Sequence, residues 1–314
     1  MGADTLSPNA PRPRSPKGGF FCHARRRDKK GFVVRRDTGG KHLAVGLLAI
    51  VVLTSEKMMD FKPGIYEDLD YPTYDSIPAW RSHDLTSIIR CPYTWKHQEF
   101  KESPALLEGR VQHTVFLEHH KFFDEYAIEP AVDKRTKAGK AEYSEWLKGL
   151  GDRTPCKQDL YDVCMERRQV VEEFIPKPEH RVELTLCWEW NGQPCKGKLD
   201  WHTGTDVWDL KTCRDASARG FRSAINSFNY HQQAAFYLNG CRAVGLPTEK
   251  FYFLAQEKAH PYPYAVYTLS EEALAYADAR NEQAMALAIE CEKKGEYQPF
   301  NQQSVTEFGI GDLS

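Results

Sequence analysis

The stretch GKLDWHTGTDVWDLKTC, residues 197–213, contains the features on which the fold and the candidate site depend. Asp209 and Lys211 lie two residues apart on a strand whose other central residues are apolar, so both side chains point to one face. Asp200 ends the preceding strand, across a short turn. An apolar central strand rarely has two charged positions without a reason. We therefore expect hairpin pairing to bring Asp200, Asp209 and Lys211 together.

This combination of charges is suited to a divalent cation. Two carboxylates close together repel each other unless a cation lies between them, and Mg²⁺ prefers one or two carboxylates with water and phosphate oxygens. A neighbouring ammonium group can hold a water nucleophile and offset the charge that develops on a phosphodiester. The alternative is an ordinary solvent-facing ion pair, which contributes less than about 1 kcal/mol.

A block of strands surrounds this stretch. From Arg181 the hydrophobic period changes from 3.6 to 2, which predicts a half-buried strand over residues 181–190. Asn191-Gly192 is a favoured pair for a tight hairpin turn. We expect an antiparallel meander of this strand with the two that follow, and then two more strands, with the four later strands over residues 196–201, 206–212, 251–256 and 264–269.

Helices are predicted on both sides of the strands, over residues 82–89, 104–117, 133–150, 158–174, 221–244 and 270–294. Ser103 and Pro104 supply an N-cap and a first-turn proline, and the apolar repeat that follows places His113 inside its helix. The order of elements predicts an α/β or α+β fold, with a helical N-terminal part and a central mixed β-sheet flanked by helices.

The N-terminal 57 residues differ in charge from the rest. They contain 12 Lys/Arg against 4 Asp/Glu, a net charge of +8, so residues 58–314 have a net charge of −10 within a total of −2. We interpret residues 1–57 as a disordered or non-native leader and residues 58–314 as one domain, with Met58 or Met59 as the natural start. The alternatives are a basic nucleic-acid-binding arm or a targeting segment.

Cysteine spacing and hydropathy exclude several classes of protein. The 9 cysteines contain no C-x-x-C pair, which argues against a zinc site, an iron-sulfur cluster or a disulfide framework and favours reduced thiols in a cytoplasmic protein. The longest apolar run, Leu43 to Leu53, is shorter than the roughly 18 residues that a spanning helix requires. We therefore expect no membrane association.

An aspartate, a hairpin turn and then D-x-K on an apolar strand resemble the PDDEXK nuclease pattern. Within that superfamily, several ordered segments resemble RecE-type phage exonucleases, the C-terminal nuclease domain of exonuclease VIII. These segments are KPGIYEDLDYPTYDS, LLEGRVQHTVFLE, DKRTKAGKAEY, VELTLCWEW and YHQQAAFY, and the resemblance covers about residues 61–300. It implies a PDDEXK restriction-endonuclease-like core.

The resemblance also implies roles for individual residues. The family's helix histidine corresponds to His113, its first metal aspartate to Asp200, its second acidic ligand to Asp209 and its lysine to Lys211. In this correspondence Asp200 and Asp209 hold the metal, Lys211 positions the attacking water, and His113 binds metal or phosphate nearby. The Q-x-x-x-Y helix motif of the superfamily corresponds to Gln233 and Tyr237, which share a helix face. The family's usual Ser-Pro is Cys91-Pro92 here, and the leader has no counterpart in the motif.

Two assignments rest on local arguments. Glu183 points away from the apolar face of its strand and could lie beside the metal as an outer ligand or a water-holding group. Lys134, Arg135, Lys137 and Lys140 form a basic cluster that could contact DNA phosphates.

Each of these assignments has a structural alternative. His113 could be an ordinary core or surface histidine, Gln233 and Tyr237 could pack a helix against the sheet, and Glu183 could be an ordinary residue at the sheet rim. The basic cluster could be a solvated face of a helix.

The function implied by the resemblance is a Mg²⁺-dependent exodeoxyribonuclease, with Mn²⁺ as a possible substitute. Such an enzyme degrades the 5′ strand of linear double-stranded DNA and leaves 3′ single-stranded overhangs for a RecT-like annealing protein in phage-type recombination. Family members form rings, so a homo-oligomeric ring at double-stranded DNA ends is expected. The alternatives are a RecB-like or Cas4-like nuclease acting on single strands, and a non-catalytic DNA-binding recombination accessory protein.

Overall fold

The computed structural model describes residues 60–99 and 103–300. The predicted leader, residues 1–57, lies outside the described residues, so its character stays a prediction. Within the described ranges no helix is long and apolar enough to cross a membrane. All eight cysteines of these ranges are free and buried, as the sequence predicts for reduced thiols.

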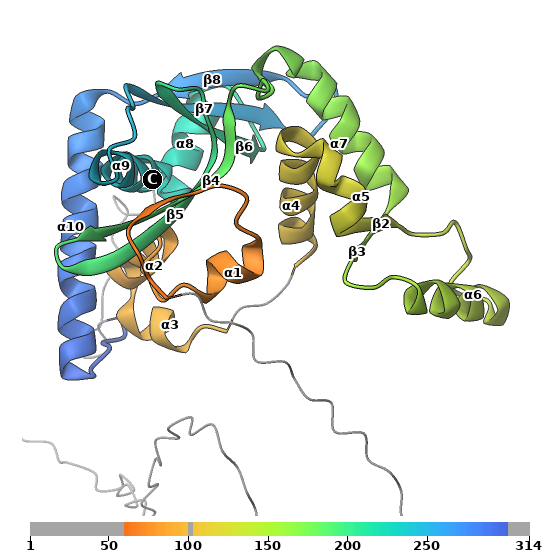
Figure 1. Cartoon of the computed structure of the whole chain (residues 1–314), viewed down its shortest axis with the longest axis horizontal. Coiled ribbons are helices and arrows are strands. Elements are labelled where there is room, and N and C mark those ends of the chain that lie inside the picture. The colour runs from red at the N-terminus through yellow and green to blue at the C-terminus, as the bar shows by residue number, and fades with distance from the viewer. Residues whose placement is uncertain (1–59, 100–102, 301–314) are drawn as a thin grey trace, which may run out of the picture. The chain divides into compact units, whose positions relative to one another are not determined.

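A six-stranded sheet forms the centre of the domain (Figure 1). Its spatial order is β1 (Gly64–Tyr66), β4 (Arg181–Trp190), β5 (Gln193–His202), β6 (Asp206–Cys213), β7 (Lys250–Glu257) and β8 (Tyr264–Thr268). Only the β6–β7 pair is parallel, and every other neighbouring pair is antiparallel. The predicted mixed sheet is therefore present, and β1 is an additional edge strand.

The β4–β5 hairpin is the longest paired segment of the sheet. Its turn residues Asn191 and Gly192 have φ values of 51° and 72°, the left-handed conformations that a tight hairpin turn needs. The ladder runs from the Trp190–Gln193 pair to the Arg181–His202 pair. This register places Glu183 of β4 opposite Asp200 of β5, which brings two acidic residues to one point of the sheet.

Helices cover both faces of the sheet and form two cores (Figure 1). On one face, α2 (Ser82–Arg90), α9 (Tyr230–Ala243) and α10 (Glu271–Lys294) pack around Trp188, Phe236 and Phe253. On the other face, α4 (Pro104–Leu117) and α7 (Gln158–Val170) pack on Trp201 and Leu254. Burying both faces explains why the central strands are rich in large apolar residues.

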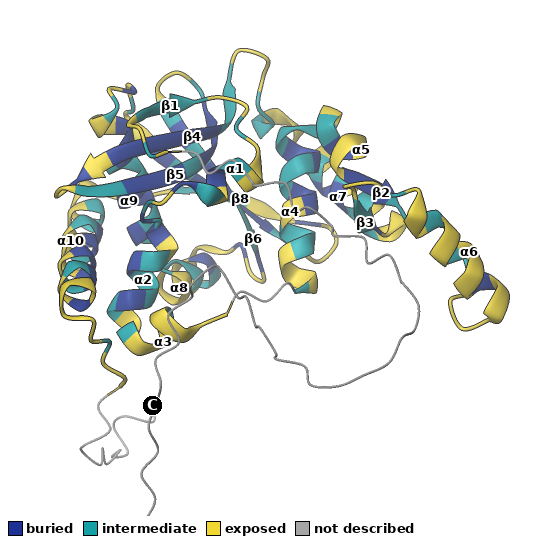
Figure 2. Ribbon diagram, turned by 60° about the horizontal axis from the view of Figure 1, so that its bottom comes forward, coloured by how far each residue is buried: buried dark blue, intermediate teal, exposed yellow. Residues whose placement is uncertain are grey.

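The remaining elements are short. They are α1 (Tyr71–Ser76), α3 (Pro92–His97), η1 (His119–Lys121), α5 (Phe122–Glu125), β2 (Tyr126–Ile128), α6 (Lys137–Lys148), β3 (Thr154–Cys156), η2 (Glu172–Phe174) and α8 (Ala218–Phe228). The strands β2 and β3 pair in parallel as a separate two-stranded sheet. Figure 2 shows that α6 lies away from the six-stranded sheet and is mostly exposed.

Two predicted helices differ from the observed ones. The stretch 221–244 is not one helix, because Asn229 adopts a left-handed conformation with φ 56° that ends α8 and starts α9. The stretch 158–174 ends as an α-helix at Val170 and continues as the short helix η2. The periodicity of side chains does not reveal such breaks, since a single left-handed residue changes the helix direction without changing composition.

Candidate metal centre and adjoining cavity

His113, Glu183 and Asp200 come together from α4, β4 and β5. The helix α4 begins with Ser103, whose hydroxyl accepts a hydrogen bond from the Leu106 backbone N–H, as expected of an N-cap. From this helix the His113 Nδ1 lies 3.8 Å from Glu183 Oε1 and 3.7 Å from Asp200 Oδ1. One nitrogen and two carboxylate oxygens of these residues all lie within 4.8 Å of one another. We call these three residues the acidic group.

The backbone at Glu183 is strained. Its φ is 47°, a left-handed value inside a strand that non-glycine residues seldom adopt. Residues on either side of it pair in register with β5, but Glu183 and Asp200 themselves do not form a ladder pair. Strain of this kind costs about 1–3 kcal/mol and is found where function requires a particular orientation. Here it accompanies a carboxylate directed toward His113 and Asp200.

The side chain of Asp200 takes the place of a sheet hydrogen bond. Its Oδ2 accepts the Leu210 backbone N–H at 2.6 Å. Correspondingly, the β5–β6 ladder contains only the Trp201–Trp208 and His202–Val207 pairs, and the strands separate beyond them. Beyond these pairs, the Asp200 side chain lies between β5 and β6. Its other oxygen, Oδ1, points to His113.

Asp209 and Lys211 lie on β6 at this separation. Lys211 Nζ is 2.5 Å from Asp209 Oδ2, and both side chains are largely buried. Gln233 Nε2 of α9 donates to Asp209 Oδ1 at 3.3 Å and to the Tyr237 hydroxyl at 3.4 Å. The two residues of the predicted helix motif therefore reach the predicted site together. The carboxylate of Asp209 contacts Lys211 and Gln233 and is not part of the acidic group, so its assignment as a metal ligand stays a prediction.

The electrostatics of the site depend on these contacts. Desolvation lowers the pKa of His113, but the negative charges of Asp200 and Glu183 outweigh it and raise this pKa to about 9. Burial raises the pKa of Glu183, yet hydrogen bonds from His113 and Lys198 leave it below its usual value.

Burial, with a contribution from the charge of Asp209, raises the pKa of Asp200. Burial opposes the charged form of Lys211, but Asp209 and Asp200 hold its pKa above its ordinary value. The site therefore concentrates negative charge that a cation would relieve.

Lys198 is a site residue that the sequence analysis missed. Its Nζ lies 3.1 Å from Glu183 Oε2. The signal was present in the sequence, since Lys198 and Asp200 are two apart on β5 and thus share a face. Lys198 also lines the cavity that adjoins the acidic group.

A cavity of about 490 Å³ opens beside the acidic group. It is lined by residues of α1, α2, β5 and the α8–α9 junction, which are Tyr71, Tyr74, Arg81, Ser82, His83, Thr86, Lys196, Lys198, Phe228, Asn229, Tyr230, Gln233 and Tyr237. No carboxylate is among these lining residues, although the domain as a whole is acidic. The lysine and arginine side chains on this lining are Arg81, Lys196 and Lys198.

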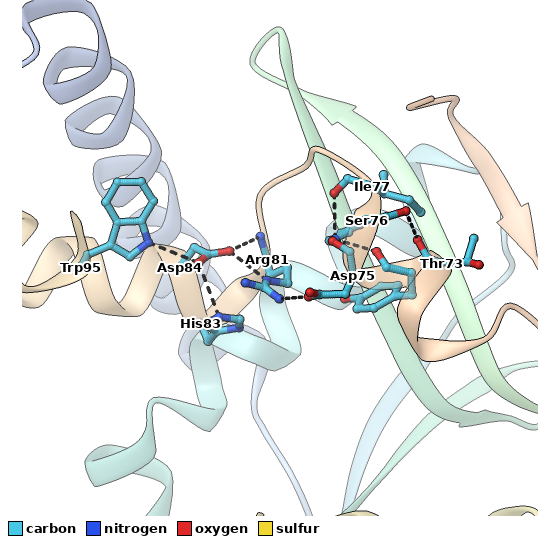
Figure 3. Close-up of polar contacts among 10 residues, drawn as sticks. Thr73, Asp75, Ser76, Ile77, Arg81, His83, Asp84 and Trp95 are labelled. Carbon is cyan, nitrogen blue, oxygen red and sulfur yellow. Dashed lines mark hydrogen bonds and ion pairs between the residues drawn. The ribbon is translucent and has the colours of Figure 1, made fainter. Parts of the chain in front are cut away.

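Two cations, the half-buried Arg81 and the buried Lys196, hold the cavity wall. Arg81 bridges Asp75 at 2.8 Å and Asp84 at 3.1 Å, and so links the C-terminal end of α1 to the start of α2 (Figure 3). Lys196 is 2% exposed, and its Nζ donates to the carbonyl oxygens of Tyr74, Asp75 and Ile77 at 2.7–3.0 Å. Both contacts fix the wall before any ligand binds.

The basic cluster lies elsewhere, in α6 and the loop before it. Lys134 Nζ pairs with Glu129 at 2.7 Å, and Arg135 pairs with Asp133 at 2.9 Å. Lys137 and Lys140 are exposed on α6. Two of the four predicted DNA-binding residues thus have acidic partners, and the cluster is separate from the acidic group in the fold (Figures 1 and 2).

The acidic group fits a divalent metal ion. An imidazole nitrogen and carboxylate oxygens are ligands that Mg²⁺, Mn²⁺ and Zn²⁺ accept. Against the effect of burial, the neighbouring carboxylates raise the pKa of His113, while burial raises the pKa of Asp200, so a bound cation would favour the ionised carboxylate. His113, Glu183 and Asp200 are therefore the residues that could hold the ion, with Asp209 beside them.

The sheet, its flanking helices and this group of side chains define a PDDEXK-like domain, the fold of a superfamily of nucleases that generally depend on divalent metals. More narrowly, the chain belongs to the family described as "PDDEXK-like domain of unknown function (DUF3799)", whose model matches residues 91–302. No curated protein matches the chain.

A solved structure agrees with the fold. A candidate exonuclease from Eubacterium rectale is similar with a TM-score of 0.50 and 15% identity, over 75% of this chain and 92% of that chain. At this identity the likeness concerns the fold alone. The protein SSO0001 also matches, with 15% identity over 60% of this chain and 88% of that chain, but its TM-score of 0.27 is too low to bear on the fold.

Proposed function

We propose that this chain is a Mg²⁺-dependent exodeoxyribonuclease that degrades the 5′ strand of linear double-stranded DNA and leaves 3′ overhangs. The observation that supports it most is the acidic group of His113, Glu183 and Asp200, with Lys211 alongside, at the point where β5 and β6 separate. The similarity of the fold to a candidate exonuclease agrees with this activity. The 5′ polarity rests on the resemblance to RecE-type enzymes.

The residues of the site have distinct roles in this proposal. A Mg²⁺ ion held at this site would polarise the scissile phosphate and lower the pKa of a water molecule. Glu183 and Asp200 supply the negative charge that attracts the ion, and His113 adds a nitrogen ligand once it has lost its proton. Lys211, protonated and buried, orients the attacking water and offsets charge on the phosphate. Gln233 and Tyr237 hold Asp209 in place.

The proposed partners follow from the same resemblance. They are double-stranded DNA ends, further copies of this chain in a ring, and a RecT-like single-strand annealing protein. Mn²⁺ is proposed as a substitute for Mg²⁺, since it accepts the same oxygen and nitrogen ligands.

The test is a linear duplex labelled at its 5′ or 3′ end, incubated with the protein and Mg²⁺ beside Asp209→Ala and Lys211→Ala. We expect release of mononucleotides from the 5′ label, abolished in both variants and by a chelator. Release from single strands alone would favour the RecB-like or Cas4-like alternative. DNA binding without release would favour the accessory protein. Release from the 3′ label alone would overturn the proposed polarity.

A further inference from the structure

Phe228 is an exposed aromatic residue at the edge of the cavity. Its exposure is 65%, the highest among the large hydrophobic residues of the described ranges. Isolated surface apolar residues are common and need no explanation. Phe228 differs because it lines the cavity together with Lys198 and Arg81, and because its ring stacks on Tyr230 at 5.5 Å between centroids and 26° between planes.

Tyr230 connects this ring to the catalytic lysine. The Lys211 Nζ lies 4.7 Å from the centre of the Tyr230 ring, a cation–π distance. Phe228, Tyr230 and Lys211 therefore form a continuous series from the edge of the cavity to β6. The Phe228 ring at the outer end of this series is thus two contacts away from Lys211.

The break at Asn229 produces this arrangement. In an uninterrupted helix, residues 228 and 230 would point about 200° apart and could not face one cavity. The left-handed conformation of Asn229, φ 56°, ends α8 at Phe228 and starts α9 at Tyr230. The Asn229 N–H still donates to the Ile225 carbonyl, so the break is a defined helix cap.

The chemistry of the cavity matches a nucleotide. Arg81 and Lys198 line the cavity but pair with carboxylates outside the lining, so a phosphate would compete with those partners, whereas the exposed aromatic rings favour the flat face of a base. Tyr71, 56% exposed, is a second aromatic residue on the lining. Stacking on such rings depends little on sequence, because every base has a π-face. This suits an enzyme that must accept each nucleotide in turn.

We propose that Phe228 stacks on a base of the bound DNA strand and thereby holds the nucleotide next to the scissile phosphate. This inference rests on the proposed function, since it takes DNA as the substrate. The inference adds a residue of the α8–α9 junction to the substrate-binding surface. The ligand of the cavity would be a nucleotide, bound through base stacking and phosphate contacts.

The test compares Phe228→Ala and Phe228→Trp with the unmodified full chain. The binding of fluorescently labelled oligonucleotides is measured by anisotropy in a chelator, which prevents cleavage. One oligonucleotide has normal bases, and a second of the same length has consecutive abasic sites. Phe123→Ala is the matched control, because Phe123 is 57% exposed on α5 and does not line the cavity.

We expect Phe228→Ala to weaken binding of the normal oligonucleotide about tenfold, by loss of one stacked base. Phe228→Ala should leave binding of the abasic oligonucleotide unchanged. Phe228→Trp should bind the normal oligonucleotide with the affinity of the unmodified chain. Equal weakening for both oligonucleotides, or no weakening while the unmodified chain binds DNA, would overturn the stacking role and leave the nuclease proposal intact. Failure of the unmodified chain to bind either oligonucleotide or to cleave DNA would overturn both.

A role of Phe228 in contacts between copies of the chain would have a different signature. Sedimentation of Phe228→Ala should match that of the unmodified chain. A change in oligomeric state together with equal losses on the two oligonucleotides would assign Phe228 to a protein interface and would overturn the proposal.

Discussion

The acidic group and the cavity lie on either side of Lys198 and differ in the charged side chains that they contain. On one side lies the acidic group, where His113, Glu183 and Asp200 converge and burial raises the pKa of Asp200. On the other side lies a cavity lined by cations and aromatic rings without a carboxylate. Lys198 belongs to both, since it contacts Glu183 and lines the cavity. Under the proposed function, this contrast corresponds to a division of roles, with the metal ion on one side and the nucleic acid backbone on the other.

The comparison is tested most directly by replacing, one at a time, Lys211 beside the acidic group and Lys198 on the cavity lining. Lys211→Met should lower the rate of DNA cleavage at least about a hundredfold with little change in DNA affinity, because it removes charge stabilisation at the phosphate. Lys198→Met should weaken DNA binding several-fold through the loss of a cation on the cavity lining. Turnover and binding are measured separately by nucleotide release and by anisotropy. Equal effects of both variants on binding would contradict the division.

Much of this arrangement could be predicted from the sequence. The strand over residues 181–190 is observed with the same bounds, and the hairpin turn at Asn191-Gly192 is present. His113 lies in its predicted helix and reaches Asp200. These features depend on local periodicity, turn chemistry and capping, which short stretches of sequence determine.

Other features depend on contacts between distant segments. The left-handed backbone of Glu183 and the broken β5–β6 ladder arise where strands meet, and no local pattern encodes them. The helix break at Asn229 leaves the apolar periodicity unchanged. The spacing of Lys198 and Asp200 on β5 indicates that they share a face, but the partner of Lys198, Glu183, lies on β4 and depends on how the two strands pair. The functional specificity of the RecE type stays a prediction.

The cavity wall has its own pH dependence. Burial lowers the pKa of Lys196 to about 8, with a further contribution from Arg81, and the unfolded value is near 10.5. Below pH 8 both states are protonated and the full cost of burying the charge is present. Between about pH 8 and 10.5 the folded state loses its proton first, so this contribution to stability improves as pH rises.

We therefore expect the stability of the unmodified chain to rise relative to Lys196→Met between pH 7.5 and 10. The shift in pKa corresponds to up to about 3 kcal/mol. The check is the difference in free energy of unfolding between the two proteins, measured by urea denaturation at each pH. Taking the difference removes the contribution of the cysteines and tyrosines that titrate in the same range. A difference that is constant with pH would refute a buried, perturbed Lys196.

The left-handed backbone of Glu183 provides a test of the acidic group. Glu183→Gly and Glu183→Ala both remove the carboxylate, so both should lose most of the stabilisation by Mg²⁺ that we expect for the unmodified chain. In the absence of metal, Glu183→Gly should be about 1 kcal/mol more stable than Glu183→Ala, because glycine adopts the left-handed conformation without the Cβ penalty. Thermal unfolding with and without Mg²⁺ measures both effects. Greater stability of the alanine variant would mean that the backbone there is not left-handed.

The smallest effect is expected from the basic cluster on α6. Lys137→Ala with Lys140→Ala should weaken DNA binding a few-fold and reduce the slope of log affinity against log salt concentration by up to about 0.9 per lost phosphate contact. Lys134→Ala with Arg135→Ala is the matched control, since these side chains already pair with Glu129 and Asp133. The salt dependence of duplex binding distinguishes them. Larger losses in the control pair would place the DNA on the loop before α6.

The hydrogen bond from the Leu210 backbone to Asp200 has a practical consequence for genetics. An isosteric amide at position 200 can turn its oxygen or its NH₂ toward that N–H, and alanine leaves the donor without a partner, so replacements there confuse lost chemistry with altered strand geometry. The Lys211 side chain instead contacts the Asp209 carboxylate and the ring of Tyr230, and neither contact belongs to the backbone ladder. A substitution at position 200 therefore alters the pairing of β5 with β6, whereas one at Lys211 leaves the buried Asp209 carboxylate without its cation.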